Sequence, residues 1–186
     1  MPRWKFILNN PAKNGGLTKW LKKQESLVAS GAHRKTSAVT AATLKVSDSS
    51  VRRVLVDTGP LVAILSRADH HHQACVQALR VLPAPLFSCW PVITEAVWLL
   101  RAYPSAVQQL LRSIGHGFVE LLSLEGSEAK SIADVMKKYS DLRPQVADAS
   151  LVYLADREGI DTIFTLDQRD FSVYRSSRKK SFKILP

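Results

Sequence analysis

Short apolar runs alternate with helical patterns from residue 54 to the end of the chain. The runs that predict strands cover residues 54–56, 86–88, 118–122, 162–166 and 182–185. Between them, apolar residues at helical spacing predict helices over 60–66, 71–81, 91–101, 104–114, 127–139 and 144–158. This alternation is typical of parallel β-α units, so the sequence predicts a three-layer α/β/α sandwich with a central parallel sheet.

Residues 1–53 differ from the rest of the chain in composition and in periodicity. They are rich in Ser, Thr and Ala between 37 and 50 and show little sustained periodicity, which predicts a linker or disorder. The exception is 17–30, where the spacing of apolar residues predicts a short amphipathic helix. That helix either docks weakly on the body or serves as a binding arm, and the basic, Ser-rich start also resembles an organelle transit peptide. We therefore expect an extension over 1–53 and one domain over 54–186.

Charge divides the chain in the same place. The whole chain has a net charge of +10, and residues 1–53 hold 11 basic and 2 acidic side chains. Residues 54–174 hold 10 basic and 14 acidic side chains, and five more basic residues follow before the end. This distribution predicts a slightly acidic body that can hold cations, flanked by basic ends that can hold polyanions.

Composition narrows the class of protein further. No window contains the run of about 18 apolar residues that a membrane-spanning helix needs, and the N-terminus lacks the apolar core of a secretory signal. Cys75 and Cys89 are too few for a disulfide framework and lack the spacing of a zinc site. We therefore expect a soluble cytoplasmic protein, without membrane association, in a reducing compartment.

Two acidic residues occupy positions that periodicity assigns to the interior. Glu95 has Val92 three positions before it and Trp98 and Leu99 after it at helical spacing. Asp148 has Leu151, Val152 and Ala155 at the same offsets. A buried carboxylate without a partner is costly and normally finds a cation, a metal or a proton. Neither helix supplies an obvious Lys or Arg on that face, so these acids are candidate metal ligands.

Two further acids follow predicted strands directly. Asp57 comes after the run 54–56, and Asp167 comes after the run 162–166. The ligand crevice of an open parallel sheet lies beyond the carboxyl ends of its strands, where the following helices also begin. All four acids can therefore converge, and ligation by oxygen alone favours Mg²⁺ or Mn²⁺ over Zn²⁺. The structural alternatives are that Asp57 caps the next helix and that Asp167 and Asp170 are ordinary turn residues.

These acids stand in segments that resemble the four successive motifs of PIN domains, most closely those of the bacterial branch that contains the VapC toxins. The segments are DTGPLVA at 57–63, WPVITEA at 90–96, ADASL at 147–151 and TLDQRDF at 165–171. The order and spacing of four motifs make the resemblance specific, and it extends from residue 54 to about 186.

The resemblance implies a PIN fold and a ribonuclease that depends on Mg²⁺ or Mn²⁺. It implies that Asp57, Glu95, Asp148 and Asp167 bind the metal, that Asp170 contributes to the site and that Thr165 orients it. It implies hydrolysis by a metal-bound water that attacks the RNA phosphodiester, with a homodimer and a cognate antitoxin as expected partners. The basic extension has no counterpart in compact toxins, so the toxin role stays open, as do a non-catalytic RNA- or protein-binding module and a DNA nuclease.

Other signals carry less weight. The basic residues nearest the C-terminus are candidate phosphate contacts or members of a solvated tail; they are Arg169, Arg175, Arg178, Lys179 and Lys180. The run His70 to His72 followed by Cys75 favours a polar helix start over a metal site. Trp90 is expected to pack near the site, with stacking on a base as the alternative. The sequence holds no serine-hydrolase elbow, phosphate-binding loop or dinucleotide motif.

Overall fold

The computed structural model of the chain describes residues 53–176 and 180–185. The helix expected over 17–30 and two of the candidate phosphate contacts, Arg178 and Lys179, lie outside these residues. In the described part of the chain, no helix is long and apolar enough to cross a membrane.

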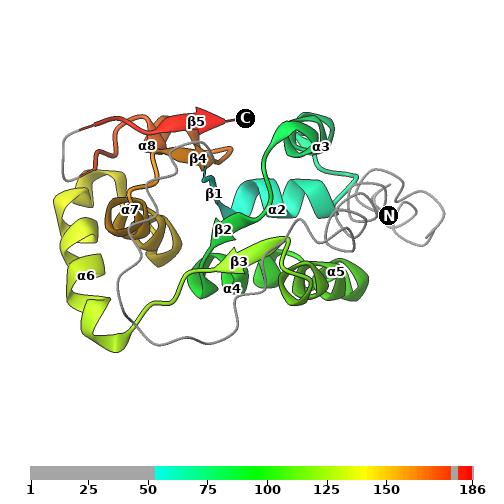
Figure 1. Ribbon diagram of the computed structural model, residues 1–186, viewed down its shortest axis with the longest axis horizontal. Helices are drawn as coiled ribbons and strands as arrows, with labels where there is room; N and C mark the ends of the chain where they lie inside the picture. The colour runs from blue at the N-terminus through cyan, green and yellow to red at the C-terminus, as the bar shows by residue number, and fades with distance from the viewer. Residues whose placement is uncertain (1–52, 177–179, 186) are drawn as a thin grey trace, which may run out of the picture.

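One parallel sheet runs through the centre of the molecule (Figure 1). Within the described residues its strands are β1 (Leu55–Val56), β2 (Leu86–Ser88), β3 (Val119–Leu121), β4 (Thr162–Phe164) and β5 (Lys183–Leu185). Their order is β3-β2-β1-β4-β5, and every neighbouring pair is parallel. The predicted parallel sheet is confirmed, with β1 in its middle.

Helices cover both faces of this sheet. Figure 1 shows α6 and α7 on one side of the strands and α2, α3 and α5 on the other, while α4 contacts both α2 and α7. The bounds are α2 (Thr58–Leu65), α3 (His72–Val81), α4 (Trp90–Leu99), α5 (Pro104–Gly115), α6 (Ala129–Lys138), α7 (Val146–Glu158) and α8 (Gln168–Phe171). Two single 3-10 turns, η3 (Gly126–Glu128) and η4 (Ser140–Leu142), precede α6 and α7. The predicted three-layer α/β/α arrangement is therefore correct.

The core consists of the central strands and the helix faces that pack on them. Leu55, Val56, Ile163 and Phe164 are fully buried, as is Leu151 on α7. Strands that are covered on both faces have continuous apolar sequences, which is why β1 and β4 could be predicted from the sequence. The predicted boundaries of these strands and of the longer helices differ from the observed ones by at most two residues.

The parallel arrangement brings three chain turns to one edge of the sheet. β1 leads through Asp57 into α2, and β2 leads through Cys89 into α4. At the same edge β4 leads through Thr165 and Asp167 into α8. Strand register fixes these turns relative to each other, because Leu55 pairs with Ile163 and Val56 with Phe164. The backbone N–H of Asp57 also donates to the carbonyl of Phe164 at 3.0 Å.

A polar network connects α7 to the start of α6. The Arg157 guanidinium and the Tyr153 hydroxyl both donate to Glu128 Oε1 at 2.7 Å. The hydrogen bond from the Glu125 backbone N–H is the largest cause that lowers the pKa of Glu128 to about 2, and the bonds from Tyr153 and Arg157 lower it further. Because Glu128 lies at the start of α6, the network fixes α6 against α7 and so fixes the helix that carries Asp148.

Gly159 ends α7 in the left-handed conformation, with φ of +66°. A Cβ would meet no atom within 4 Å there, so the cost of Gly159→Ala is that of the backbone conformation alone. We expect this variant to lower the free energy of unfolding by about 1–2 kcal/mol in urea denaturation. The control is Gly115→Ala, which also meets nothing within 4 Å but sits in α5 without a positive φ. An equal loss in both variants would contradict this explanation.

Candidate active site

The carboxylate of Asp57, at the edge of the sheet where the parallel strands end, accepts a hydrogen bond at each of its two oxygens. Its residue is 6% exposed, and it caps α2 by accepting a 2.7 Å hydrogen bond from the Thr58 backbone N–H. Its second oxygen accepts a 2.7 Å hydrogen bond from the Thr165 hydroxyl, which lies at the end of β4. Asp57 is thus both the helix cap considered as an alternative and a side chain fixed between two strands.

Glu95 is connected to Asp57 through one residue. The Thr58 hydroxyl donates to Glu95 Oε2 at 2.7 Å, while the backbone N–H of the same threonine donates to Asp57. Sequence reasoning did not select Thr58, although its place directly after Asp57 at a helix start was a usable signal. Its hydroxyl makes Glu95 on α4 and Asp57 after β1 parts of one polar arrangement.

Asp167 and Asp170 extend the arrangement from the other side of Asp57. The hydroxyl oxygen of Thr165 accepts from the Asp167 backbone N–H at 3.0 Å. Asp167 in turn caps α8, since its side chain accepts from the Asp170 backbone N–H at 3.0 Å. The predicted orienting role of Thr165 therefore has a geometric basis: it donates to one acid and accepts from the backbone of another.

Asp148 approaches from α7. It is half-buried, and its Oδ2 accepts the Gln145 backbone N–H at 2.9 Å in a capping box. Burial raises the pKa of its carboxyl, and the negative charges of Glu95, Asp167 and Asp170 raise that pKa further, against the lowering effect of the Gln145 bond. Asp148 is therefore within electrostatic reach of acids from α4 and from the β4–α8 turn.

The pKa of Asp57 reflects the same crowding. Burial is the largest cause that raises it from 3.8 to about 6, and the charges of Asp148 and Glu95 add to the effect. The hydrogen bonds from Thr165 and Thr58 oppose this increase without cancelling it. A buried carboxylate with other carboxylates as its charged neighbours is stabilised by an added cation.

The residues of this edge fit a hard divalent cation. Their side-chain donors are carboxylate oxygens, which suit Mg²⁺ and Mn²⁺. Among the five acids, Asp170 has an ion-pair partner in the described part of the chain, with Arg169 Nε 2.9 Å from its Oδ1. In the present conformation no three His, Cys, Asp or Glu side chains of the described residues are close enough to hold one ion together. The fit therefore rests on the donor chemistry and the mutual repulsion of these acids.

The surroundings of Glu95 differ from the sequence expectation. Val92 and Ala96 are fully buried, but Trp98 is 64% exposed and Leu99 is 49% exposed. The expectation that the whole apolar stripe is interior was wrong, because periodicity does not distinguish a face that packs in the core from one that is left at the surface. Trp90, expected to pack near the site, is also exposed, at 58%.

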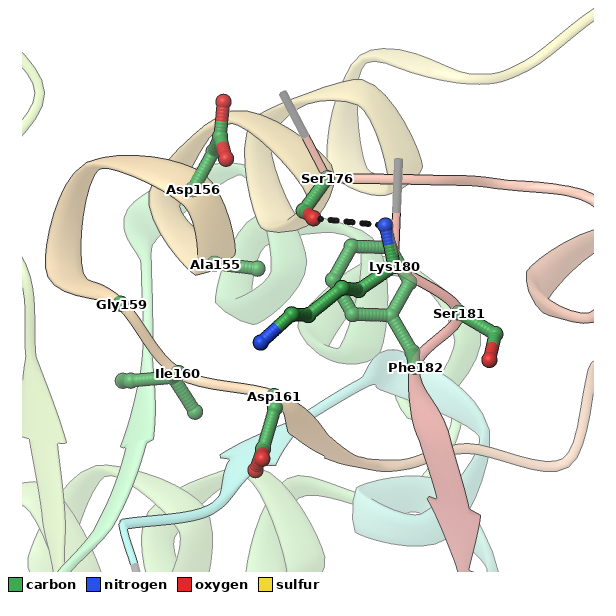
Figure 2. A pocket seen from close by; sticks show the side chains of 9 residues that line it. All are labelled: Ala155, Asp156, Gly159, Ile160, Asp161, Ser176, Lys180, Ser181 and Phe182. Carbon is green, nitrogen blue, oxygen red and sulfur yellow. Dashed lines mark hydrogen bonds between the residues drawn. The ribbon is translucent and has the colours of Figure 1, made fainter. Parts of the chain in front are cut away.

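The candidate phosphate contacts are separated by the fold. Arg169 is highly exposed beside Asp170, at the acidic edge, and Arg175 follows α8 by a few residues. Lys180 lies instead at the opposite edge, where it lines a cavity of about 160 Å³ at the end of α7 (Figure 2). From Asp148 to Gly159 the helix rises by about 16 Å. Lys180 is therefore not brought together with the acids.

The same cavity lacks the features of a catalytic site. Its lining combines the C-terminal end of α7 with the segments that precede β4 and β5, including Asp156, Asp161 and Phe182. In Figure 2 the Lys180 side chain extends across it, and the labelled carboxylates do not point toward one common position. Chemistry is thus better supported at the carboxyl edge.

The two cysteines are not candidate nucleophiles. Both are buried and free, and burial raises the pKa of each thiol to about 11. The His70 to Cys75 segment starts α3, where the His72 ring bonds to the Ala63 carbonyl at 2.8 Å. That contact agrees with the structural interpretation of these histidines.

Comparison with known proteins places this geometry in context. The PIN domain family model matches residues 54–176. Ribonuclease VapC26 of Mycobacterium tuberculosis (strain ATCC 25618 / H37Rv) is 32% identical over 135 residues, which are 72% of this chain and all of that protein. The crystal structure of M. tuberculosis VapC20, a toxin that cleaves the sarcin-ricin loop, aligns with a TM-score of 0.61 over 72% of this chain and 99% of that one. At 16% identity, this second likeness concerns the fold.

The raised pKa of the buried Asp57 predicts how the free energy of unfolding depends on pH. A folded-state pKa of about 6, above the ordinary 3.8, means that folding favours the protonated acid. The resulting stability is present below pH 3.8 and is lost as the pH rises through 6. In EDTA, we expect Asp57→Asn to raise the free energy of unfolding by about 1–3 kcal/mol at pH 8, and we expect this gain to vanish near pH 4.

The check is urea denaturation of both proteins at the two pH values. Asp134→Asn serves as the control, because Asp134 is exposed on α6 and pairs only with the exposed Lys130 among the described residues. That variant is expected to change stability by less than about 0.5 kcal/mol at either pH. A loss of stability in Asp57→Asn that is equal at pH 4 and pH 8 would contradict the account.

Proposed function

The chain belongs to the PIN-domain family, and from that premise we propose that it is a metal-dependent endoribonuclease of the VapC type. The observation that carries the proposal is the hydrogen-bonded series that runs from Glu95 through Thr58, Asp57 and Thr165 to Asp167. It fixes acids from three separate turns of the sheet edge, and no side-chain base of the described residues takes part in this hydrogen-bonded series. The match to the ribonuclease relative covers all of that protein and 72% of this chain, which supports the same conclusion.

The metal-binding residues in this proposal are Asp57, Glu95, Asp148 and Asp167, with Asp170 as a further contributor. Mg²⁺ and Mn²⁺ are the cofactors that their oxygen donors favour. Such a cation, when bound, lowers the pKa of its water and stabilises charge on the phosphodiester. Thr58 and Thr165 hold the carboxylates in place, so less reorganisation is needed when RNA binds.

Water is the nucleophile in this proposal. Cys89, which precedes α4 at the same edge, is fully buried and has a thiol whose pKa burial raises to about 11. It is therefore a protonated core side chain at neutral pH and not an attacking thiolate. Hydrolysis by an activated water needs only the acids and the cation that they hold.

In this proposal, basic residues beside the acidic site and at the two ends of the chain bind the RNA. Arg169 is exposed at the acidic edge, and Arg175 lies close to it in sequence. The extension over 1–53, with 11 basic and 2 acidic residues, supplies most of the net positive charge of the chain. In this arrangement the basic groups bind phosphates while the acidic centre acts on one of them.

Protein partners are part of the proposal. Trp90, Trp98 and Leu99 leave apolar surface exposed along α4, beside Glu95. Exposed aromatic surface of this kind is typical of protein contacts. We propose that the chain acts as a toxin held by a cognate antitoxin and that it forms a homodimer. Its buried free thiols agree with a reducing cytoplasm.

The central prediction concerns Asp148→Asn, which removes a charge and leaves the shape. With Mg²⁺ or Mn²⁺, we expect the wild type to cut a pool of structured RNA and the variant to lose at least about 100-fold in rate, because a proposed ligand of the cation is removed and loss of even an outer partner of a metal site costs about 10- to 100-fold. EDTA should abolish cutting by the wild type. Gel analysis of end-labelled RNA measures these rates, with Asp134→Asn as the control that keeps full activity.

Two other outcomes select the alternatives. RNA binding without cutting under any metal condition, retained in Asp148→Asn, would favour the non-catalytic binding module. Faster cutting of DNA of the same sequences would favour a DNA nuclease, which shares this metal chemistry but does not need the 2′-hydroxyl.

If the extension over 1–53 binds RNA and the acidic site cuts it, removing the extension should affect binding more than cutting. A chain of residues 53–186 is expected to keep metal-dependent cutting at saturating RNA and to bind RNA more weakly, because most of the excess positive charge is removed. The slope of log Kd against log salt should also become shallower. Fluorescence anisotropy at several salt concentrations measures both. An unchanged Kd and slope would remove the extension from RNA binding.

A further inference from the structure

An apolar groove lies on the face of the sheet that α2, α3 and α5 cover (Figure 1). It has a volume of about 30 Å³, and its lining includes Leu61, Ile64, Leu79, Leu86, Leu110 and Val119. Gln109 and Ser113 are the polar side chains of this lining, and the Ser113 hydroxyl donates to the Leu110 carbonyl at 2.6 Å. A water in such a groove finds few polar partners, so the end of an apolar side chain is the favoured occupant.

The groove lies at the edge of the sheet where the strands begin, away from the acids. Leu86 and Val119 are the first residues of β2 and β3, and they pair with each other. Ile64 lies in the last turn of α2, and Leu79 lies in the last turn of α3, just before the chain enters β2. Asp57 caps the opposite end of α2. An occupant of the groove therefore leaves the acidic edge open.

The described chain begins at the same edge. Its first residue is Arg53, whose guanidinium stacks on the Phe87 ring at 4.5 Å from the centroid. The Val54 carbonyl accepts the Phe87 backbone N–H at 2.9 Å, so the chain enters the domain beside the start of β2. Residues 1–52 lie outside both the described structure and the PIN family match over 54–176. The extension therefore joins the domain next to the strand that supplies Leu86 to the groove.

Residues 17–30 of the extension have the spacing of a helix that needs an apolar partner. Their apolar residues at helical spacing are Leu17, Trp20, Leu21, Leu27 and Val28. Lys19, Lys22 and Lys23 fall on the opposite face. A helix of this length is marginal in water unless its apolar face is buried. The segment and the groove thus each offer the apolar surface that the other requires.

The connection between the two makes docking within one chain favourable. Residues 31–52 can span roughly 70 Å when extended, which places no restriction on reaching the groove. A tether of this kind also raises the local concentration of the segment well above that of a separate molecule.

We propose that residues 17–30 form an amphipathic helix whose apolar face docks in this groove of the same chain. One apolar side chain enters the groove, and the others cover the surface of α2, α3 and α5 around it. The lysines then face solvent at a fixed place on the domain, where they can contact phosphates. The inference is independent of the proposed function, because docking needs neither a cation nor RNA.

Methyl NMR of the full chain, without metal or RNA, tests the docking directly. Nuclear Overhauser effects are expected between the methyl groups of Ile64 or Leu110, which line the groove, and side chains of residues 17–30. The control is the methyl group of Ile132 on α6, on the other side of the sheet, which should show none with that segment. Absence of these effects at the groove in the folded chain would overturn the proposal.

Two other occupants give distinct results in the same experiment. Effects to the apolar run 4–8 in place of 17–30 would assign the groove to that run and overturn the choice of segment. Effects seen only between labelled and unlabelled chains of a mixed sample would show that a second copy fills the groove, and docking within one chain would be wrong.

Leu21→Asp and Ser26→Asp form a matched pair of variants. Both add one negative charge to the segment, but Ser26 lies about 140° around the helix from Leu21, on the basic face. We expect Leu21→Asp to lose the Overhauser effects and to lower the melting temperature, because burying a charge in an apolar groove is unfavourable. Ser26→Asp should keep both. Neither residue belongs to the core of the domain, so equal effects of the two variants, or none in Leu21→Asp, would contradict the docking.

Discussion

A carboxylate buried at the end of the central strand is the constraint on which the site depends. Asp57 is 6% exposed, directly after β1, and its two oxygens are held by Thr58 and Thr165. These bonds fix its position but do not supply positive charge. The pKa of about 6 shows that burial and neighbouring acids outweigh the two donors. In the proposed function, a divalent cation would supply the positive charge that this environment lacks, and it would connect the fold to hydrolytic chemistry.

The parallel sheet explains how distant acids come to surround Asp57. At this edge β1, β2 and β4 lead into α2, α4 and α8, so Asp57 and Asp167 cap α2 and α8, and Glu95 lies in the second turn of α4. Asp148 joins them from the first turn of α7. Helix starts also favour negative charge, which offsets part of the repulsion. The fold therefore concentrates acids along one edge of the sheet, and in the proposed function a divalent cation would supply the compensating charge.

The sequence predicted the sheet, the longer helices and the edge where the acids lie, because apolar runs and strand ends follow simple periodicity. It did not predict the exposure of Trp98 and Leu99, since spacing alone does not reveal what a face packs against. Lys180 was grouped with the site by composition, whereas strand direction places it at the opposite edge.

The most direct test of the account follows the Asp57 carboxyl itself by carbon-13 NMR as the pH is raised, first in EDTA and then with Mg²⁺. We expect an apparent pKa of about 6 for this carboxyl without metal. With saturating Mg²⁺ we expect that pKa to fall well below this value, because a bound cation favours the ionised carboxylate. An ordinary pKa without metal, or a raised pKa that Mg²⁺ does not change, would contradict the claim that the buried acid is held for a divalent cation.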